Sequence, residues 1–333
     1  SCSMVQVVMV EPIIARQFWI MSPQHGEIVA AALAPKLDDE LLVRTLYSGV
    51  SRGTESLVFR GKVPRSQYRS MRAPFQEGDF PGPVKYGYSS VGEVLDGPDE
   101  FTGQVVFCLY PHQNRYVVPS GAVTPLPQDL PPGRAVLAAN METAVNVVWD
   151  ARPLAGDRVV VIGGGVVGLL VAWLCGHTPG ADVTLVDVNP SRASVAAALG
   201  LAFSTEAPSE ANADLVIHAS GQPEGLTTAL AVAGMAATIV EASWYGDRTV
   251  PLPLGEEFHS RRLTLKSSQV GQLPADRTPR WTHSRRLALA LALLMEPRLD
   301  ALITGESRFE ELPGLMTKLS QAPGATLCHR IVY

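Results

Sequence analysis

Short apolar runs rich in Val, Ile and Leu recur through the N-terminal part of the chain, each bounded by Gly, Pro or Asp. Runs of this kind between turn-forming residues are typical of β-strands. The pattern predicts strands at residues 5–10, 26–33, 40–47, 89–95, 104–109 and 115–119. Several short strands without long helices between them favour a small barrel.

Residues 60–82 interrupt this pattern, because they are rich in Pro, Arg and Gly and show little periodicity. A loop of this length in a compact domain is usually either functional or disordered. We predict a long loop over the active site, and a disordered insertion is the alternative.

From residue 131 onward the apolar positions follow a helical period, which predicts a helix over 131–151. Buried strands and amphipathic helices then alternate. The strands are predicted at 159–162, 183–186, 214–219, 237–241 and 263–266, and the helices at 169–175, 225–233 and 285–295. This alternation predicts a doubly wound parallel sheet.

The change of pattern divides the 333-residue chain into two predicted domains. Residues 1–140 form the β-rich domain, and residues 141–299 form the parallel α/β domain. Residues 300–333 return to short segments, so we expect the C-terminus to rejoin the first domain. The predicted fold class is α/β.

A glycine motif opens the α/β domain, between a predicted strand and a predicted helix. Gly163, Gly165 and Gly168 fit the pattern G-x-G-x-x-G, and Asp187 lies about 19 residues beyond the last of them. The first glycine permits a tight turn, the second lets a pyrophosphate approach the backbone, and the third lets helix and strand pack closely. The free N–H groups of the helix then hold the pyrophosphate. We predict a dinucleotide site that also includes Val166 and Val167.

The acid at the end of the second strand decides which dinucleotide is expected. A carboxylate at Asp187 accepts hydrogen bonds from the adenosine ribose of NAD and repels the 2′-phosphate of NADP. Arg192 could hold that phosphate, but beside Asp187 we expect it to pack along the adenine or to face solvent. FAD uses the same motif, usually at the N-terminus of the chain. NAD is therefore favoured over NADP, and Asn189 and Ser220 complete the predicted cofactor site.

Composition narrows the class of protein further. Hydrophobic residues make up 46% of the chain, but no apolar run is long enough to span a bilayer and no signal-peptide pattern is present. A net charge of −5 gives no reason to expect a nucleic-acid partner. The four cysteines are scattered, as in reduced cytoplasmic proteins. We expect a cytoplasmic protein without membrane partners.

Five segments resemble the medium-chain dehydrogenase/reductase superfamily. Residues 49–55 are similar to its Gly-Val-Cys-Arg-Thr-Asp segment, and residues 87–94 to its Gly-His-Glu-x-x-Gly-x-Val segment. Residues 140–144, 187–192 and 302–304 resemble its Cys-x-x-x-Thr-Ala, Asp-x-Asn-Pro-x-Arg and Leu-Ile-Thr segments. The resemblance covers nearly the whole chain and implies a GroES-like β-rich catalytic domain joined to a Rossmann domain. The amino-acid sequences of several segments most closely resemble the branch that contains bacteriochlorophyllide hydroxyethyl dehydrogenase.

The chain departs from this superfamily where the zinc-dependent members bind their catalytic metal. Ser51, Tyr88 and Ala139 stand at the three ligand positions. A hydroxyl, a phenol and a methyl group do not make a normal zinc shell, which uses thiolate, imidazole or carboxylate. The four-cysteine structural-zinc lobe is absent from the sequence as well. We therefore predict no bound zinc.

Without zinc, a protein group must supply a proton or hydrogen bond during hydride transfer. Tyr88 is the first candidate, and the alternative is an aromatic ring that fills the space of the metal. Thr54 resembles the hydroxyl residue of the family's proton relay, and Ser51 is either a participant or a filler. Glu142 lies near the nicotinamide or on a helix surface, and His112 is either a substrate-pocket residue or a satisfied turn histidine.

The resemblance also implies roles near the cofactor. Arg52 resembles the arginine that contacts the pyrophosphate, and Thr143 the threonine beside the nicotinamide ring. Glu55 is expected to pair with a nearby arginine, and His218 to be a core histidine.

The sequence thus predicts a metal-independent, NAD-dependent oxidoreductase that transfers hydride between the cofactor and a secondary alcohol, ketone or imine of a small molecule. An ene- or quinone reductase that uses NAD(P)H is the first alternative. A cofactor-binding protein without catalysis is the second. Because Rossmann sheets of this superfamily commonly pair edge to edge, we expect a homodimer.

Overall fold

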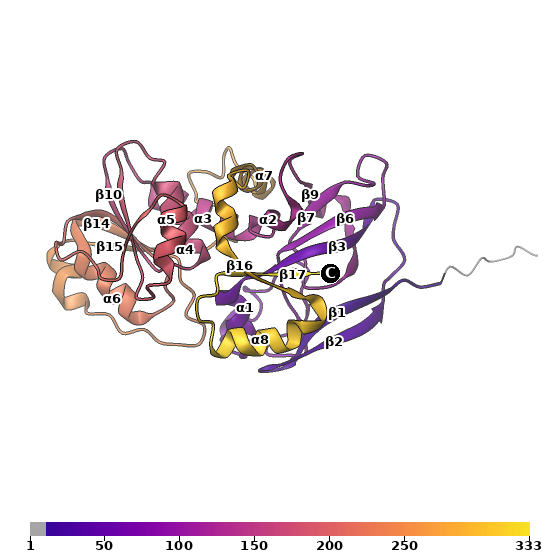
Figure 1. Cartoon of the computed structure of the whole chain (residues 1–333). Coiled ribbons are helices and arrows are strands. Elements are labelled where there is room, and N and C mark those ends of the chain that lie inside the picture. The colour runs from indigo at the N-terminus through magenta and orange to yellow at the C-terminus, as the bar shows by residue number, and fades with distance from the viewer. Residues whose placement is uncertain (1–10) are drawn as a thin grey trace, which may run out of the picture.

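The computed structural model describes residues 11–333, so the strand predicted at residues 5–10 lies outside the described residues. The chain forms two lobes that lie side by side, a β-rich lobe and a lobe built on a parallel sheet (Figure 1). No helix among the described residues is long and apolar enough to cross a bilayer.

The β-rich lobe contains two sheets whose hydrogen-bonded order does not close into one barrel. The smaller sheet runs β2 (His25–Ala32), β1 (Ile14–Ser22), β5 (Val84–Lys85) and β4 (Glu77–Gly78). The larger runs β16 (Ile303–Arg308), β17 (Cys328–Val332), β3 (Glu40–Val50), β6 (Ser90–Asp96), β7 (Val105–Cys108) and β9 (Val123–Pro125), with β8 (Arg115–Pro119) beside β3. Since β17 pairs with β3, the C-terminus does rejoin the first lobe, as the sequence predicts.

The other lobe is a six-stranded parallel sheet in the doubly wound order of a dinucleotide-binding fold. Its strands lie in the order β12 (Ala202–Ser204), β11 (Asp182–Val186), β10 (Arg158–Ile162), β13 (Ala213–His218), β14 (Ala233–Glu241) and β15 (Thr264–Ser267). Its helices are α4 (Val166–Cys175), α5 (Arg192–Ala198) and α6 (Pro223–Val232), with α3 (Ala138–Ala151) and α7 (His283–Leu293) packed together beside them. The predicted domain boundary at residue 140 falls inside α3.

Shorter elements complete the two lobes. The helices are α1 (Arg52–Phe59), α2 (Pro132–Ala135) and α8 (Leu312–Gln321), and the single turns are η1 (Arg65–Gln67), η2 (Ser120–Ala122), η3 (Leu254–Phe258), η4 (Pro297–Leu302) and η5 (Phe309–Glu311). Sequence reasoning missed β1, although Pro12 and Pro23 stand on either side of it, and it missed α1, α5 and β12. It also missed α8, which begins at a proline-containing turn.

Apolar packing holds the lobes together. One cluster of buried side chains runs from Val91 and Phe107 of the β-rich lobe to Val161 and Leu185 of the parallel sheet, by way of α3. Residues 60–82 belong to a second cluster, in which Val63, Ala73 and Phe80 are buried. Because its apolar side chains are packed in this way, the long loop is not a disordered insertion.

Candidate active site

The glycine turn between β10 and α4 has an open space above it. Gly163 has a φ of 110°, which favours glycine, and a Cβ there would lie 2.5 Å from the backbone nitrogen of Ser220. A Cβ on Gly168 would overlap the carbonyl oxygen of Gly163, so helix and strand lie too close together here for any residue larger than glycine. Gly165, by contrast, has nothing within 4 Å of its Cβ position. This combination of tight turn and open cradle fits the pyrophosphate of a dinucleotide.

Asp187 follows β11 and faces this turn. One oxygen of its carboxylate accepts the N–H of Gly164 at 2.6 Å, and the other accepts the N–H of Asn189 at 2.8 Å. A carboxylate has about four acceptor sites, so Asp187 can still accept hydrogen bonds from ribose hydroxyls. The Asn189 side chain accepts the N–H of Ser191 at 3.0 Å and thus shapes the loop.

Two arginines stand near Asp187, and they differ in how they are held. Arg192 is buried, and its guanidinium donates to the carbonyl oxygens of Ala325 and Thr326 at 2.7 and 3.4 Å. It therefore does not face solvent. Arg52 begins α1 in the other lobe, and burial together with the charge of Arg192 lowers its pKa. The structure thus brings α1 to the nucleotide end of the parallel sheet.

The residues that flank the cradle come from α4 and α3. Val166 and Val167 form the first turn of α4 and are half-buried. The Thr143 hydroxyl donates to the carbonyl of Ala139 at 3.1 Å, within α3. This bond orients the threonine but leaves its lone pairs free.

The hydroxyl groups of Ser51, Thr54 and Tyr88 form one cluster. Burial and the nearby charge of Glu55 raise the pKa of Tyr88 to about 12, and hydrogen bonds with Ser51 and Thr54 act in the opposite direction. The phenol is therefore protonated at neutral pH. Because α1 carries both Arg52 and Thr54, the same helix connects this hydroxyl cluster to the nucleotide end of the sheet.

A buried hydrogen-bond chain lies behind the hydroxyl cluster. His112 donates from Nε2 to the Glu55 carboxylate at 2.6 Å, and its Nδ1 accepts from Ser48 Oγ at 2.7 Å. Ser48 in turn accepts from the hydroxyl of Tyr333 at 2.9 Å, and the second Glu55 oxygen accepts the N–H of Ser51 at 2.5 Å. The expectation that Glu55 pairs with an arginine was wrong, because its partner is a histidine. Both ring nitrogens of His112 are bonded, so the ring orients Glu55.

Glu142 makes a different contact from the one predicted near the nicotinamide. Its carboxylate accepts from Nε of Arg286 on α7 at 2.9 Å, and both side chains are buried. Arg286 also donates to Asn146 at 2.8 Å. Burial raises the pKa of Glu142, although the charge of Arg286 lowers it. The pair joins α3 to α7, and no contact links Glu142 to the hydroxyl cluster within residues 11–333.

Proteins of known function share this fold and part of this sequence. L-threonine 3-dehydrogenase of Rhizobium rhizogenes is 30% identical over 119 residues, which is 36% of this chain and 34% of that protein. D-guloside 3-dehydrogenase of Escherichia coli is 24% identical over 292 residues, 79% of this chain and 83% of its own. The chain thus spans about a third of the first relative and most of the second. No protein-family profile matches the sequence.

Among solved structures, L-idonate 5-dehydrogenase of E. coli superposes with a TM-score of 0.80 at 14% identity, covering 97% of this chain and 99% of that one. An alcohol dehydrogenase of E. coli complexed with NADH has a TM-score of 0.74 at 16% identity, with coverage of 96% and 99%. A dehydrogenase of Sinorhizobium meliloti bound to NADP has a TM-score of 0.76 at 17% identity, with coverage of 96% and 100%.

The relatives and the fold agree. In sequence and fold the chain resembles the medium-chain dehydrogenase/reductase superfamily. Ser51, Tyr88 and Ala139 stand at the positions that resemble the catalytic zinc ligands of this superfamily. Ser51 and Tyr88 offer only neutral oxygens, since the Tyr88 phenol is protonated, and Ala139 offers none. This donor set does not fit a zinc first shell. Among residues 11–333, no group of three His, Cys, Asp or Glu side chains is arranged to hold a metal ion.

Sequence reasoning missed several members of these networks. Ser48 and Tyr333 come from β3 and the end of β17, and no local signal marks them. Glu241 ends β14 and contacts His218, which is buried as predicted but is part of a polar group. An acid at the end of a buried strand was the signal that could have identified Glu241.

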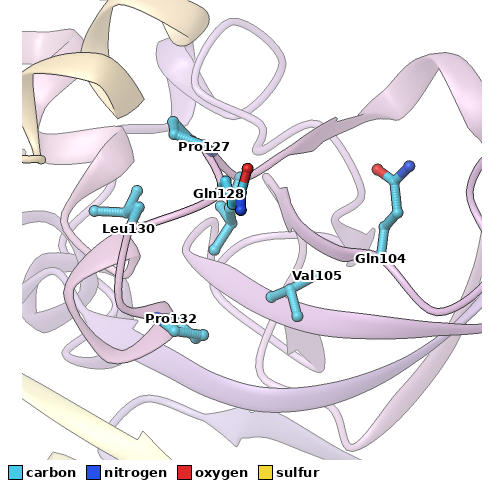
Figure 2. Close-up of a pocket in the computed structure, with 7 residues that line it drawn as sticks. Gln104, Val105, Pro127, Gln128, Leu130 and Pro132 are labelled. Carbon is cyan, nitrogen blue, oxygen red and sulfur yellow. The ribbon is translucent and has the colours of Figure 1, made fainter.

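Two surface hollows of the β-rich lobe lie elsewhere. One of about 290 Å³ is lined by Gln104, Val105, Leu126, Pro127, Gln128, Leu130 and Pro132, and Figure 2 shows it between strand ends and the turn before α2. A second of about 410 Å³ lies beyond that turn and is lined by residues that include Arg134 and Arg330. None of the residues predicted for the active site lines either hollow, so we do not place substrate there.

Proposed function

We propose that this protein is a nicotinamide-dependent oxidoreductase that interconverts a secondary alcohol and a ketone, or an imine counterpart, of a small molecule without a catalytic metal ion. The observation that carries the proposal is the hydroxyl cluster of Ser51, Thr54 and Tyr88. It occupies the positions that resemble the metal site of the superfamily, at the helix that reaches the nucleotide turn. The dehydrogenases among the relatives support an activity on alcohols.

The cofactor, when bound, supplies or accepts the hydride. The protein must then give a proton or a hydrogen bond to the carbonyl oxygen. Tyr88 suits this task because its phenol keeps its proton at neutral pH. The hydroxyl groups of Ser51 and Thr54 lower the pKa of Tyr88, and they would stabilise the charge that develops when the proton moves. The negative charge of Glu55 disfavours a negative charge on the Tyr88 oxygen. The hydrogen bond from His112 spreads the charge of the Glu55 carboxylate and so favours proton transfer from Tyr88.

NAD(H) is the cofactor that we propose, in preference to NADP(H). Asp187 presents a carboxylate beside the turn, where it would repel a 2′-phosphate. The guanidinium of Arg192 is occupied by two carbonyl groups and is not directed at such a phosphate. Relatives of this fold were solved with NADH and with NADP, so the fold alone does not make this choice.

The experiment is a combined assay of metal and turnover. Purified protein is analysed for bound metals, treated with a strong chelator, and assayed with NADH against a panel of ketones and enones. We expect less than a tenth of an equivalent of zinc and unchanged turnover of a ketone after chelation. Stoichiometric zinc whose removal abolishes turnover would overturn the metal-free proposal. Turnover of enones alone would favour the ene-reductase alternative, and NADH binding without turnover of any compound would favour the non-catalytic one.

A further inference from the structure

A second buried polar network lies at the carboxyl end of the parallel sheet, away from the hydroxyl cluster. His218 is the last residue of β13 and Glu241 the last of β14, and the two residues are paired in register. The ring of His218 is fully buried. It bonds with Glu241 through Nδ1 at 2.8 Å and with Ser220 through Nε2 at 2.5 Å.

The bonds define the direction of this network. A carboxylate only accepts, so Nδ1 of His218 carries the proton toward Glu241. In a neutral ring Nε2 is then an acceptor, and Ser220 donates its O–H to it. Glu241 is itself held, because it accepts from the hydroxyl of Tyr245 at 3.0 Å and from the N–H of Ser243 at 2.7 Å. The Ser220 oxygen accepts the N–H of Gln222 at 3.1 Å and keeps one lone pair.

The position of Ser220 shows which ligand that lone pair can meet. The Ser220 backbone lies against Gly163, the first glycine of the nucleotide turn. In a sheet of this order, the strands on one side of the turn bind the adenosine half of a dinucleotide, and those on the other side bind the second half. Asp187 lies on the first side, whereas β13 and β14 lie on the second. Ser220 therefore borders the half that would hold the nicotinamide riboside.

The segment after Glu241 also contacts the other lobe. Trp244 packs against the cluster of buried side chains that includes Phe59. A Cβ on Gly246 would lie 2.6 Å from the carbonyl oxygen of Lys62, and the Lys62 ammonium lies 3.7 Å from the Asp247 carboxylate.

The same three side-chain types act as nucleophile, base and orienting acid in some hydrolases. That function does not fit here. The N–H of Gly221 is bonded to Ser243 and the N–H of Gln222 to Ser220, so neither is available to stabilise an oxyanion.

We propose that Ser220, His218 and Glu241 form a positioning relay for the nicotinamide riboside half of the cofactor. Glu241 orients His218, and His218 orients the Ser220 hydroxyl so that its free lone pair accepts a hydrogen bond from the bound cofactor. This inference rests on the proposed function, since it assumes that a nicotinamide dinucleotide binds. The three residues act as positioning residues, and only Ser220 touches the ligand.

The test compares the affinity for NADH with the affinity for ADP, which lacks the second ribose and the nicotinamide. Ser220→Ala and His218→Asn should each weaken NADH binding about three- to tenfold, the range for one net hydrogen bond, and change ADP binding less than twofold. Asn keeps a nitrogen near the place of Nδ1 and loses the partner of Ser220. His218→Gln can place its amide oxygen near the place of Nε2, where it accepts the Ser220 O–H, and should restore part of the NADH affinity. Thr228→Ala, which removes an exposed hydroxyl of α6 bonded to a helix carbonyl, is the matched control.

Gly225→Ala perturbs the relay without changing its chemical groups. A Cβ there would lie 2.5 Å from Ser220 Oγ and 2.6 Å from His218 Nε2, so both the serine hydroxyl and the histidine ring must shift and their hydrogen bond is disturbed. It should weaken NADH binding as Ser220→Ala does, and it serves if a His218 variant does not fold. The relay would be overturned if the variants lost equal affinity for NADH and ADP, or if Ser220→Ala lost affinity for neither. The three side chains would then serve only to pack the ends of the strands. If the wild-type protein binds neither NADH nor NADPH, the proposed function fails instead.

Discussion

Replacing Tyr88 by phenylalanine separates its chemistry from its packing. The ring would keep its edge-to-face contact with Tyr86, at 5.9 Å between centroids, and only the hydroxyl would be lost. A net hydrogen bond contributes about 0.5–1.5 kcal/mol, and removing a buried hydroxyl also relieves its desolvation. We therefore expect the free energy of unfolding to change by about 1 kcal/mol or less, which for a chain of this length shifts the melting temperature by about 1–2 °C or less.

The effect of Tyr88→Phe on catalysis should be much larger. A positioned proton donor contributes about 10²–10⁴ in rate, or roughly 3–5 kcal/mol of transition-state free energy. Steady-state kinetics with NADH and a ketone that the wild-type protein reduces would measure kcat/KM, and differential scanning calorimetry would measure stability. Tyr86→Phe is the matched control, because the Tyr86 ring contacts the Tyr88 ring and burial raises the pKa of its phenol well above the usual value. A Tyr88→Phe enzyme within threefold of wild-type kcat/KM would refute the role of Tyr88 as proton donor.

Two further predictions concern buried charge. Arg286→Met leaves the Glu142 carboxylate buried and unpaired, so urea unfolding should show a loss of about 3–5 kcal/mol in the free energy of unfolding. The double variant Arg286→Met with Glu142→Gln should lose less stability. Equal losses in the single and double variants would contradict the ion-pair argument. Burial lowers the pKa of His329, so its ring stays neutral in the folded protein at pH values where it is protonated in the unfolded chain. Its contribution to stability is therefore complete above about pH 6.5 and is lost as pH falls toward the folded pKa. His329→Gln should flatten this part of the pH profile of urea unfolding, and identical profiles for both proteins would show the reasoning to be wrong.

Much of the fold could be predicted from local pattern. Six of the elements between residues 158 and 241, namely β10, α4, β11, β13, α6 and β14, agree with their predictions to within a few residues, because each has a clear apolar period. The short elements α5 and β12 were not predicted. The turn at the glycine motif could also be predicted from the sequence. The positive φ of its first residue and the close approach of helix to strand both involve residues no more than five positions apart. β1 and α8 were missed although their patterns are local: β1 pairs with the adjacent strand β2, and Leu312, Met316 and Leu319 lie on one face of α8.

The candidate site was predicted in part. The resemblance named Ser51, Thr54 and Tyr88 one by one, and tertiary contacts bring their hydroxyl groups together. It gave no reason to join Glu55 to His112, which lie 57 residues apart in the chain. Likewise, Glu142 finds Arg286 across 144 residues and thereby joins two helices.

The amino-acid sequence by itself determined the alternation of strands and helices, the glycine turn with Asp187 after it, and the loss of thiolate and imidazole at the superfamily's metal positions. These properties depend on residue type and on spacing over one or two elements. The tertiary structure alone decided which buried polar groups meet. A buried donor or acceptor must be satisfied by whatever side chain the packing of distant strands brings within reach, and this choice cannot be read from the neighbours along the chain. For this reason His218 is locally a core histidine, and in the folded protein it is the centre of the Ser220–Glu241 network.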